Sequence, residues 1–232
     1  MDVFLNGFVM AVKLLLAGDK EIIEIALLTL KVSGTATLIA VFIGVPIGFL
    51  LALTSFPGRN LLVSIINYGM GLPPVVVGLV VWLLLSRYGP FGMLGLLYTP
   101  AAMVVAQGII AFPIVTGFTL AAFQQLHPKL MLQILSLGAS RLQLLWLMAR
   151  EARMGLLAAV MAGFGGAVSE VGASMMVGGN LVGSTRTLTT ATVLAVNKGQ
   201  QELGIAFSII LLFIAFAVTV ILTTAQQRGR CP

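Results

Sequence analysis

The chain has 232 residues, of which 59% are hydrophobic and only 9% are charged, against about 45–50% and about 25% in soluble globular proteins. Its mean hydropathy is +1.10. This composition excludes a water-soluble fold, because so few charged residues cannot cover the surface. The net charge of +6 does not indicate nucleic-acid binding, since the basic residues are separated by apolar runs rather than clustered with aromatic side chains. The single cysteine, Cys231, excludes an internal disulfide or a cysteine metal site.

The first apolar stretch, residues 3–17, is interrupted by Asn6 and Lys13. It is shorter than the roughly 20 apolar residues that a helix needs to cross the hydrocarbon core. Residues 1–21 are therefore predicted to form an interfacial or packed helix, with a tilted crossing as the alternative. We expect no removable signal peptide, because Asp2 precedes the stretch and no small-residue cleavage site follows it.

Residues 22–225 are predicted to form a transmembrane domain, because five apolar runs are each long enough to cross a bilayer. The predicted spans lie near residues 22–54, 61–86, 98–123, 154–179 and 203–225. The fold class is thus an all-α polytopic membrane protein. Glycine and proline recur inside the spans, which favours either close helix packing or a moving element.

Orientation follows from the Lys and Arg residues, which are in excess in cytoplasmic loops. The segment 124–153 carries four basic residues and one acid, whereas four acids precede residue 25. We expect the N-terminus outside and the C-terminus inside, with residues 226–232 as a cytoplasmic tail. Within 124–153, apolar residues recur at spacings of three and four around Gly138-Ala139-Ser140. This pattern predicts a helix, a turn and a helix that dock onto a partner or the membrane surface.

The run Leu135-Ser136-Leu137-Gly138-Ala139-Ser140-Arg141 resembles the coupling loop of binding-protein-dependent ABC transporter permeases. In that family the pattern E-A-A, three residues and Gly precedes Ala-Ser. The resemblance implies a type I permease fold and a coupling helix that fits an ATP-hydrolysing subunit. The residues implied in coupling are Leu135, Gly138, Ala139, Ser140 and Arg141. The chain departs from the pattern, since Leu132-Gln133-Ile134 replaces E-A-A and Arg150-Glu151 replaces a later Leu-Pro.

A second block is similar to the molybdate and tungstate branch of the family, and most to its tungstate-specific permeases. Molybdate permeases typically have G-E-F-G-A-T and then G-N-I-P-G-K-T-Q-T-L. The corresponding runs here are Ser169-Glu170-Val171-Gly172-Ala173-Ser174, Val177-Gly178-Gly179-Asn180 and Gly183-Ser184-Thr185-Arg186-Thr187-Leu188-Thr189-Thr190-Ala191. The resemblance implies import of a tetrahedral oxyanion across a prokaryotic cytoplasmic (inner) membrane. Tungstate is expected, with molybdate and sulfate as alternatives.

The same resemblance implies the partners. They are a second copy of the chain, two ATPase subunits inside, and a tungstate- or molybdate-binding protein outside. No G-x-x-x-x-G-K-[ST] phosphate loop occurs in the sequence. The chain is therefore not expected to be an enzyme or to hold a cofactor, and ATP and Mg would bind the ATPase subunit. An ATP-independent channel or secondary transporter is the alternative, although it would need ionisable residues inside the spans. A membrane scaffold without transport activity is a third reading.

A dianion needs hydrogen-bond donors or cations along its path, because burying an unpartnered charge costs many kcal/mol. The segment 180–202 is predicted to be an outer, gate-like loop that supplies them. Its candidate path residues are Asn180, Ser184, Thr185, Arg186, Thr187, Thr189 and Thr190. The alternative is an ordinary polar loop in which Arg186 pairs with Glu202 or a lipid headgroup.

Apart from Glu24, at the watery end of the first predicted span, Glu170 is the only acid inside the predicted spans. A carboxylate would repel an anionic substrate, so a direct binding role is not expected. We expect a structural role, in which Glu170 accepts hydrogen bonds or is protonated between glycine-rich helices, together with Gly172, Gly178 and Gly179. We expect no metal site.

Overall fold

The computed structural model describes residues 2–127 and 129–227, which form helices joined by turns and irregular loops, without a strand. Residues 228–232 of the predicted tail, including Arg228, Arg230 and Cys231, lie outside the described residues. The helices are α1 (Asp2–Ala17), α2 (Lys20–Leu53), α3 (Arg59–Met70), α4 (Pro74–Leu85), the 3-10 helix η1 (Gly92–Leu94), α5 (Pro100–Gln124), α6 (Leu130–Ser136), α7 (Arg141–Glu151), α8 (Arg153–Val168), α9 (Gly172–Gly178), α10 (Leu188–Asn197) and α11 (Gln201–Gln227).

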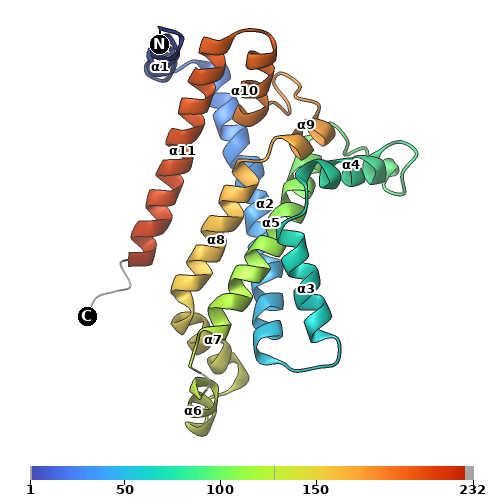
Figure 1. The fold of residues 1–232 in the computed structure, drawn as a ribbon, viewed down its shortest axis with the longest axis vertical. Helices are drawn as coiled ribbons and strands as arrows, with labels where there is room; N and C mark the ends of the chain where they lie inside the picture. Colours follow the sequence, from blue (N-terminus) through green and yellow to red (C-terminus); the bar gives the residue numbers. More distant parts are fainter. Residues whose placement is uncertain (1, 128, 228–232) are drawn as a thin grey trace.

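The centre of the molecule is formed by α2, α5 and α8, which pack side by side along its long axis (Figure 1). Small residues permit the close approach. A Cβ atom on Gly48 would lie 2.8 Å from the carbonyl oxygen of Thr116, and one on Gly163 would lie 2.5 Å from Val115 Cγ2. This is the small-residue packing by which membrane helices associate without a hydrophobic driving force.

Three helices are long and apolar enough to cross a membrane unbroken, namely α2, α5 and residues 201–224 of α11. They coincide with three of the predicted spans. The predicted spans 61–86 and 154–179 are instead bent helix pairs, with angles of 101° between α3 and α4 and 57° between α8 and α9. Counted by length and composition, the described chain has up to five spans.

The sharp bend between α3 and α4 has a local cause in the run Gly71-Leu72-Pro73-Pro74. Gly71 ends α3, and Pro74 occupies the first position of α4, where its missing N–H is not needed. Pro73 disfavours a helical conformation in the residue before it. As a result, α4 leaves the side of the bundle (Figure 1). It packs on α9, where a Cβ atom on Gly78 would lie 2.6 Å from Ala173 Cα.

The N-terminal helix α1 is seen nearly end-on in Figure 1, so it runs across one end of the bundle rather than along it. It packs against α11, with Gly7 facing Ile205. Asn6 Nδ2 donates a hydrogen bond to Glu202 Oε1 at 2.8 Å. The chain then turns into α2, whose first turn is capped by the Asp19 carboxylate.

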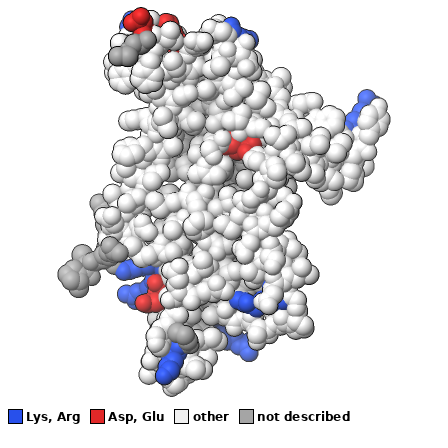
Figure 2. All heavy atoms as spheres, in the orientation of Figure 1, with Lys and Arg blue, Asp and Glu red and all other residues white. Residues whose placement is uncertain are grey.

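Most charged groups gather toward the two ends of the bundle (Figure 2). Between the ends, the face seen there is largely uncharged, apart from one acidic group and a basic group at the tip of the lateral projection. The end formed by α6 and α7 carries basic residues and one acid, Glu151. The opposite end, at α1, α10 and the start of α2, carries most of the acids. This asymmetry is the one expected if α6 and α7 face the cytoplasm, although the orientation itself stays a prediction.

Candidate functional site

The segment predicted to couple to an ATPase forms two short helices, α6 and α7, joined by a glycine turn. Gly138 has φ +79°, a left-handed conformation that favours glycine, and its N–H bonds to the Leu135 carbonyl oxygen at 3.0 Å. Ser140 and Gln143 then start α7 with a reciprocal capping box. The helix, turn and helix therefore lie where the sequence pattern places them.

One side of this element is buried and the other is exposed. Ile134, Leu144 and Met148 pack into a cluster with Phe123 of α5. Leu137, at the turn, is 87% exposed, and Arg141 is also exposed. The sequence contains no acid between Glu24 and Glu151. Up to Glu151 at the end of α7, the exposed surface of the α6–α7 element therefore has cationic but no acidic side chains, beside exposed apolar ones.

Glu170 lies at the break between α8 and α9 and is 5% exposed. Its Oε1 accepts a hydrogen bond from the Ala173 N–H at 2.6 Å, and its carbonyl oxygen accepts one from Thr189 Oγ1 at 3.3 Å. Gly172, beside it, faces Val75 of α4, where an added Cβ atom would lie 3.0 Å from Val75 Cγ2. Glu170 thus sits where four helices meet: α4, α8, α9 and α10.

The two later glycines of this group have steric and conformational reasons to be glycine. A Cβ atom on Gly178 would lie 2.8 Å from Met103 Sδ. Gly179 ends α9 with φ +72° and lies against the Tyr98 ring. Both positions hold α9 against α5 and the loop that precedes it.

A buried amide in α5 belongs to the same region and was not among the predicted site residues. Gln107 is 2% exposed, and its Nε2 donates to Ser174 Oγ at 3.0 Å. Among the described residues, its Oε1 has no hydrogen-bond partner. The signal that identifies it is an uncharged polar side chain in the middle of an apolar run, which marks a helix–helix contact in a membrane.

The segment 180–202 is not a continuous loop, because α10 occupies ten of its residues. Thr185, Thr187, Thr189 and Thr190 are all buried. Thr185 Oγ1 donates to the Gly178 carbonyl oxygen at 2.6 Å and accepts from the Leu181 N–H at 2.9 Å. The predicted donors are therefore engaged with one another and with the backbone, and Ser184 is the exposed hydroxyl of the group.

Asn180, the remaining uncharged residue of that group, bonds to one of the same threonines. Asn180 accepts from Thr190 Oγ1 at 2.9 Å, and the Thr187 N–H donates to Thr190 Oγ1 at 3.0 Å in a capping arrangement that starts α10. Thr29 of α2 accepts from the Leu188 N–H at 2.9 Å. These bonds hold residues 169–190, here called the α9–α10 corner, to the central helices.

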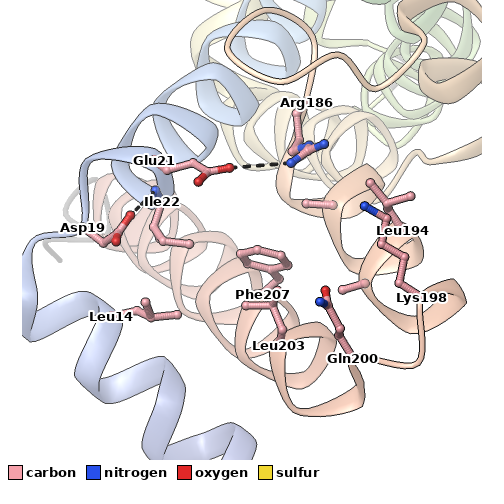
Figure 3. Close-up of a pocket in the computed structure, with 12 residues that line it drawn as sticks. Leu14, Asp19, Glu21, Ile22, Arg186, Leu194, Lys198, Gln200, Leu203 and Phe207 are labelled. Carbon is pink, nitrogen blue, oxygen red and sulfur yellow. Dashed lines mark hydrogen bonds and ion pairs between the residues drawn. The ribbon is translucent and has the colours of Figure 1, made fainter.

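Arg186 leaves this network and pairs with Glu21 at the start of α2, Nη1 to Oε1, at 3.6 Å (Figure 3). The expected alternative partner, Glu202, instead binds Asn6. Arg186 is 18% exposed and borders two cavities of about 200 and 350 Å³. Asp19, Lys198 and Gln200 also line the smaller cavity (Figure 3). Within residues 2–127 and 129–227, no group of three His, Cys, Asp or Glu side chains has the arrangement of a metal site.

Comparisons with known proteins agree with this architecture. The chain is 37% identical over 227 residues to the tungstate uptake system permease protein TupB of Peptoclostridium acidaminophilum, covering 98% of this chain and all of that one. It is 40% identical to a probable anion ABC transporter permease of Haloferax volcanii, covering 91% and 92% of the two chains. The molybdenum permease ModB of Escherichia coli is more distant, at 28% identity over 79% of this chain and 83% of that one.

Among solved structures, a chain of the MetNI methionine ABC transporter in an inward-facing conformation superposes with a TM-score of 0.67 at 16% identity. The match covers 91% of this chain and 95% of that one, and it shows the fold. Residues 44–229 match the family described as binding-protein-dependent transport system inner membrane component. The chain therefore belongs to this family of ABC transporter permeases of the inner membrane.

Proposed function

We propose that the chain is the permease subunit of an ABC importer that moves tungstate into the cytoplasm. The observation that carries the proposal is the 37% identity to a tungstate permease over 98% of this chain and all of that one, against 28% to the Escherichia coli molybdenum permease. Two copies of the chain enclose the path, and an extracytoplasmic oxyanion-binding protein delivers the substrate. Two ATPase subunits dock on the α6–α7 element, and they bind the ATP and Mg.

The fold offers a direct mechanical link from the docking element to the centre. Ala152 alone separates α7 from α8, and it is buried. A displacement of α7 is therefore passed to α8, a helix of 16 residues, or about 24 Å at 1.5 Å per residue. At its far end α8 reaches the break at Glu170, where α9 packs on α4. In our proposal, motion at this break opens and closes the path.

Within the α9–α10 corner, we propose that Ser184 and Arg186 meet the oxyanion as it enters. Ser184 is exposed, and Arg186 borders both cavities at this end. The other five predicted donors act by holding the corner in shape. Substitution Arg186→Ala tests the direct role: tungstate uptake that keeps its concentration dependence would exclude Arg186 from the gate.

The transported ion is tested in cells that lack their own tungstate, molybdate and sulfate uptake systems. The chain is expressed with its ATPase and binding protein, and accumulated tungsten is measured by mass spectrometry. We expect uptake that a large excess of sulfate leaves unchanged and that molybdate reduces only weakly. Equal competition by molybdate would assign a broader oxyanion specificity.

The ATP requirement separates an importer from a channel. In proteoliposomes that contain the permease and ATPase subunits, tungstate-loaded binding protein is expected to stimulate ATP hydrolysis that orthovanadate inhibits. Tungstate flux through the permease chain without ATPase subunits would favour a channel or secondary transporter instead.

A further inference from the structure

The α6–α7 end carries a second surface, which lies on α7 and the start of α8 rather than on the glycine turn. Leu142, Trp146 and Arg150 follow one another at intervals of four residues, so they form one stripe along α7. Trp146 is 61% exposed, and the Arg150 guanidinium lies 5.4 Å from the centre of its ring. The stripe thus combines an apolar surface, an amphipathic ring and a cation.

The contact between α8 and α11 places this stripe at the boundary of the bilayer. Gln226 Nε2, near the end of α11, donates to the Met154 carbonyl oxygen, near the start of α8, at 3.1 Å. One apolar helix therefore begins where another ends. Figure 1 shows α7 level with the adjacent ends of α2 and α3, whereas α6 extends beyond them. Tryptophan and arginine are enriched at this depth, where a ring and a charged head meet lipid headgroups.

An open cavity of about 570 Å³ adjoins the stripe. Leu147, Arg150, Glu151, Arg153 and Met154 line it. Its described lining side chains include two guanidinium groups and one carboxylate, and the guanidinium fork matches the geometry of phosphate oxygens. Figure 2 shows basic groups at the side of the bundle at this level, next to the end of α11.

We infer that Trp146, Arg150 and Arg153 bind the phosphate of an anionic phospholipid headgroup at this face of the membrane. Arg150 and Arg153 attract the phosphate, and the Trp146 ring and Leu142 rest against the upper part of the acyl chains. The site is separate from the turn at Gly138, so lipid and ATPase occupy different sides of the same element. The inference does not depend on which ion the protein transports.

The test uses the full chain in phosphatidylcholine vesicles that contain a minor fraction of phosphatidylglycerol. Trp82→Phe leaves Trp146 as the single tryptophan. Its fluorescence is quenched by brominated acyl chains carried on either lipid. We expect brominated phosphatidylglycerol to quench more strongly per molecule than brominated phosphatidylcholine. Each arginine is expected to raise the affinity for the anionic headgroup about fivefold. The double variant Arg150→Gln, Arg153→Gln should therefore bind phosphatidylglycerol about 25-fold less tightly and lose its preference for this lipid.

Two further variants separate headgroup binding from general charge and from misfolding. Arg87→Gln removes an exposed arginine beyond α4 and should leave the preference for phosphatidylglycerol unchanged. The double variant Arg150→Lys, Arg153→Lys keeps the positive charge and should retain most of the preference for phosphatidylglycerol. The proposal is overturned if both lipids quench equally, or if the preference survives the double glutamine substitution. Absence of quenching by either lipid would overturn it too, because protein would then cover Trp146.

Discussion

The α9–α10 corner and the α6–α7 element both contain serine or threonine caps beside glycine turns, yet they present different surfaces. In the corner, Thr185 and Thr190 are fully buried and bond to groups within the corner. In the α6–α7 element, the capping Ser140 is exposed and Leu137 beside it is almost entirely so. Similar local motifs therefore stabilise local structure in both places. What a partner or substrate can reach is decided by the helices packed around the motif.

The comparison is most strongly tested by Thr185→Val, which keeps the side-chain volume. The substitution leaves the Gly178 carbonyl oxygen and the Leu181 N–H without their partner. We expect the free energy of unfolding to fall by about 2–3 kcal/mol, since a buried unpaired group such as the Gly178 carbonyl oxygen costs about 1–3 kcal/mol and the part-buried Leu181 N–H adds less. The change in the free energy of unfolding is measured on the purified chain in detergent. Thr219→Val, at an exposed hydroxyl of α11, is the control and should change stability little; equal effects would contradict a buried role for Thr185.

The structural role predicted for Glu170 implies different outcomes for two substitutions. Glu170→Gln keeps an acceptor for the Ala173 N–H and should preserve assembly and most of the tungstate uptake. Glu170→Leu removes this acceptor and should lower the free energy of unfolding by about 1–3 kcal/mol, because Ala173 is fully buried. Unfolding and uptake are measured on the same preparations. Normal expression of Glu170→Gln with complete loss of uptake would require a direct role of the carboxylate in transport.

In the α6–α7 element, the position most sensitive to the backbone conformation is Gly138, because of its positive φ. No atom lies within 4 Å of a Cβ atom added there, so Gly138→Ala reports only the strain of a positive φ. We expect a loss of about 1–2 kcal/mol in the turn, visible as weaker co-purification with the ATPase subunit. Gly165→Ala in α8 is the matched control, since its Cβ atom also meets nothing and its φ is not positive. If both variants bind the ATPase normally, the turn does not fix the docking geometry.

The smallest effect is expected for the ion pair between Arg186 and Glu21. Glu21 is 62% exposed, so water screens the attraction. A double-mutant cycle with Arg186→Gln and Glu21→Gln should give a coupling of about 0.2–1 kcal/mol that decreases as salt is added. A coupling independent of salt would mean that the pair is more enclosed than its exposure indicates.

Much of this architecture is predictable because hydrophobic length and glycine position are local properties. The extents of α2, α5 and α11, and the turn at Gly138, follow from them. Burial of the corner does not follow, since the sequence shows the density of hydroxyls but not which helices cover them. The pairing of Arg186 with Glu21, rather than Glu202, joins residues 165 positions apart and depends on how α2 and α10 pack.

The bend at Pro73 also has a consequence for the order in which the protein is made. The face of α4 around Gly78 packs on Ala173, which lies 95 positions later in the chain. At about 5–20 residues per second, a ribosome takes about 5–20 seconds to reach it. During that interval α4 has no α9 to cover its glycine face. The nascent chain must therefore hold this apolar helix without its packing partner until α9 has been made.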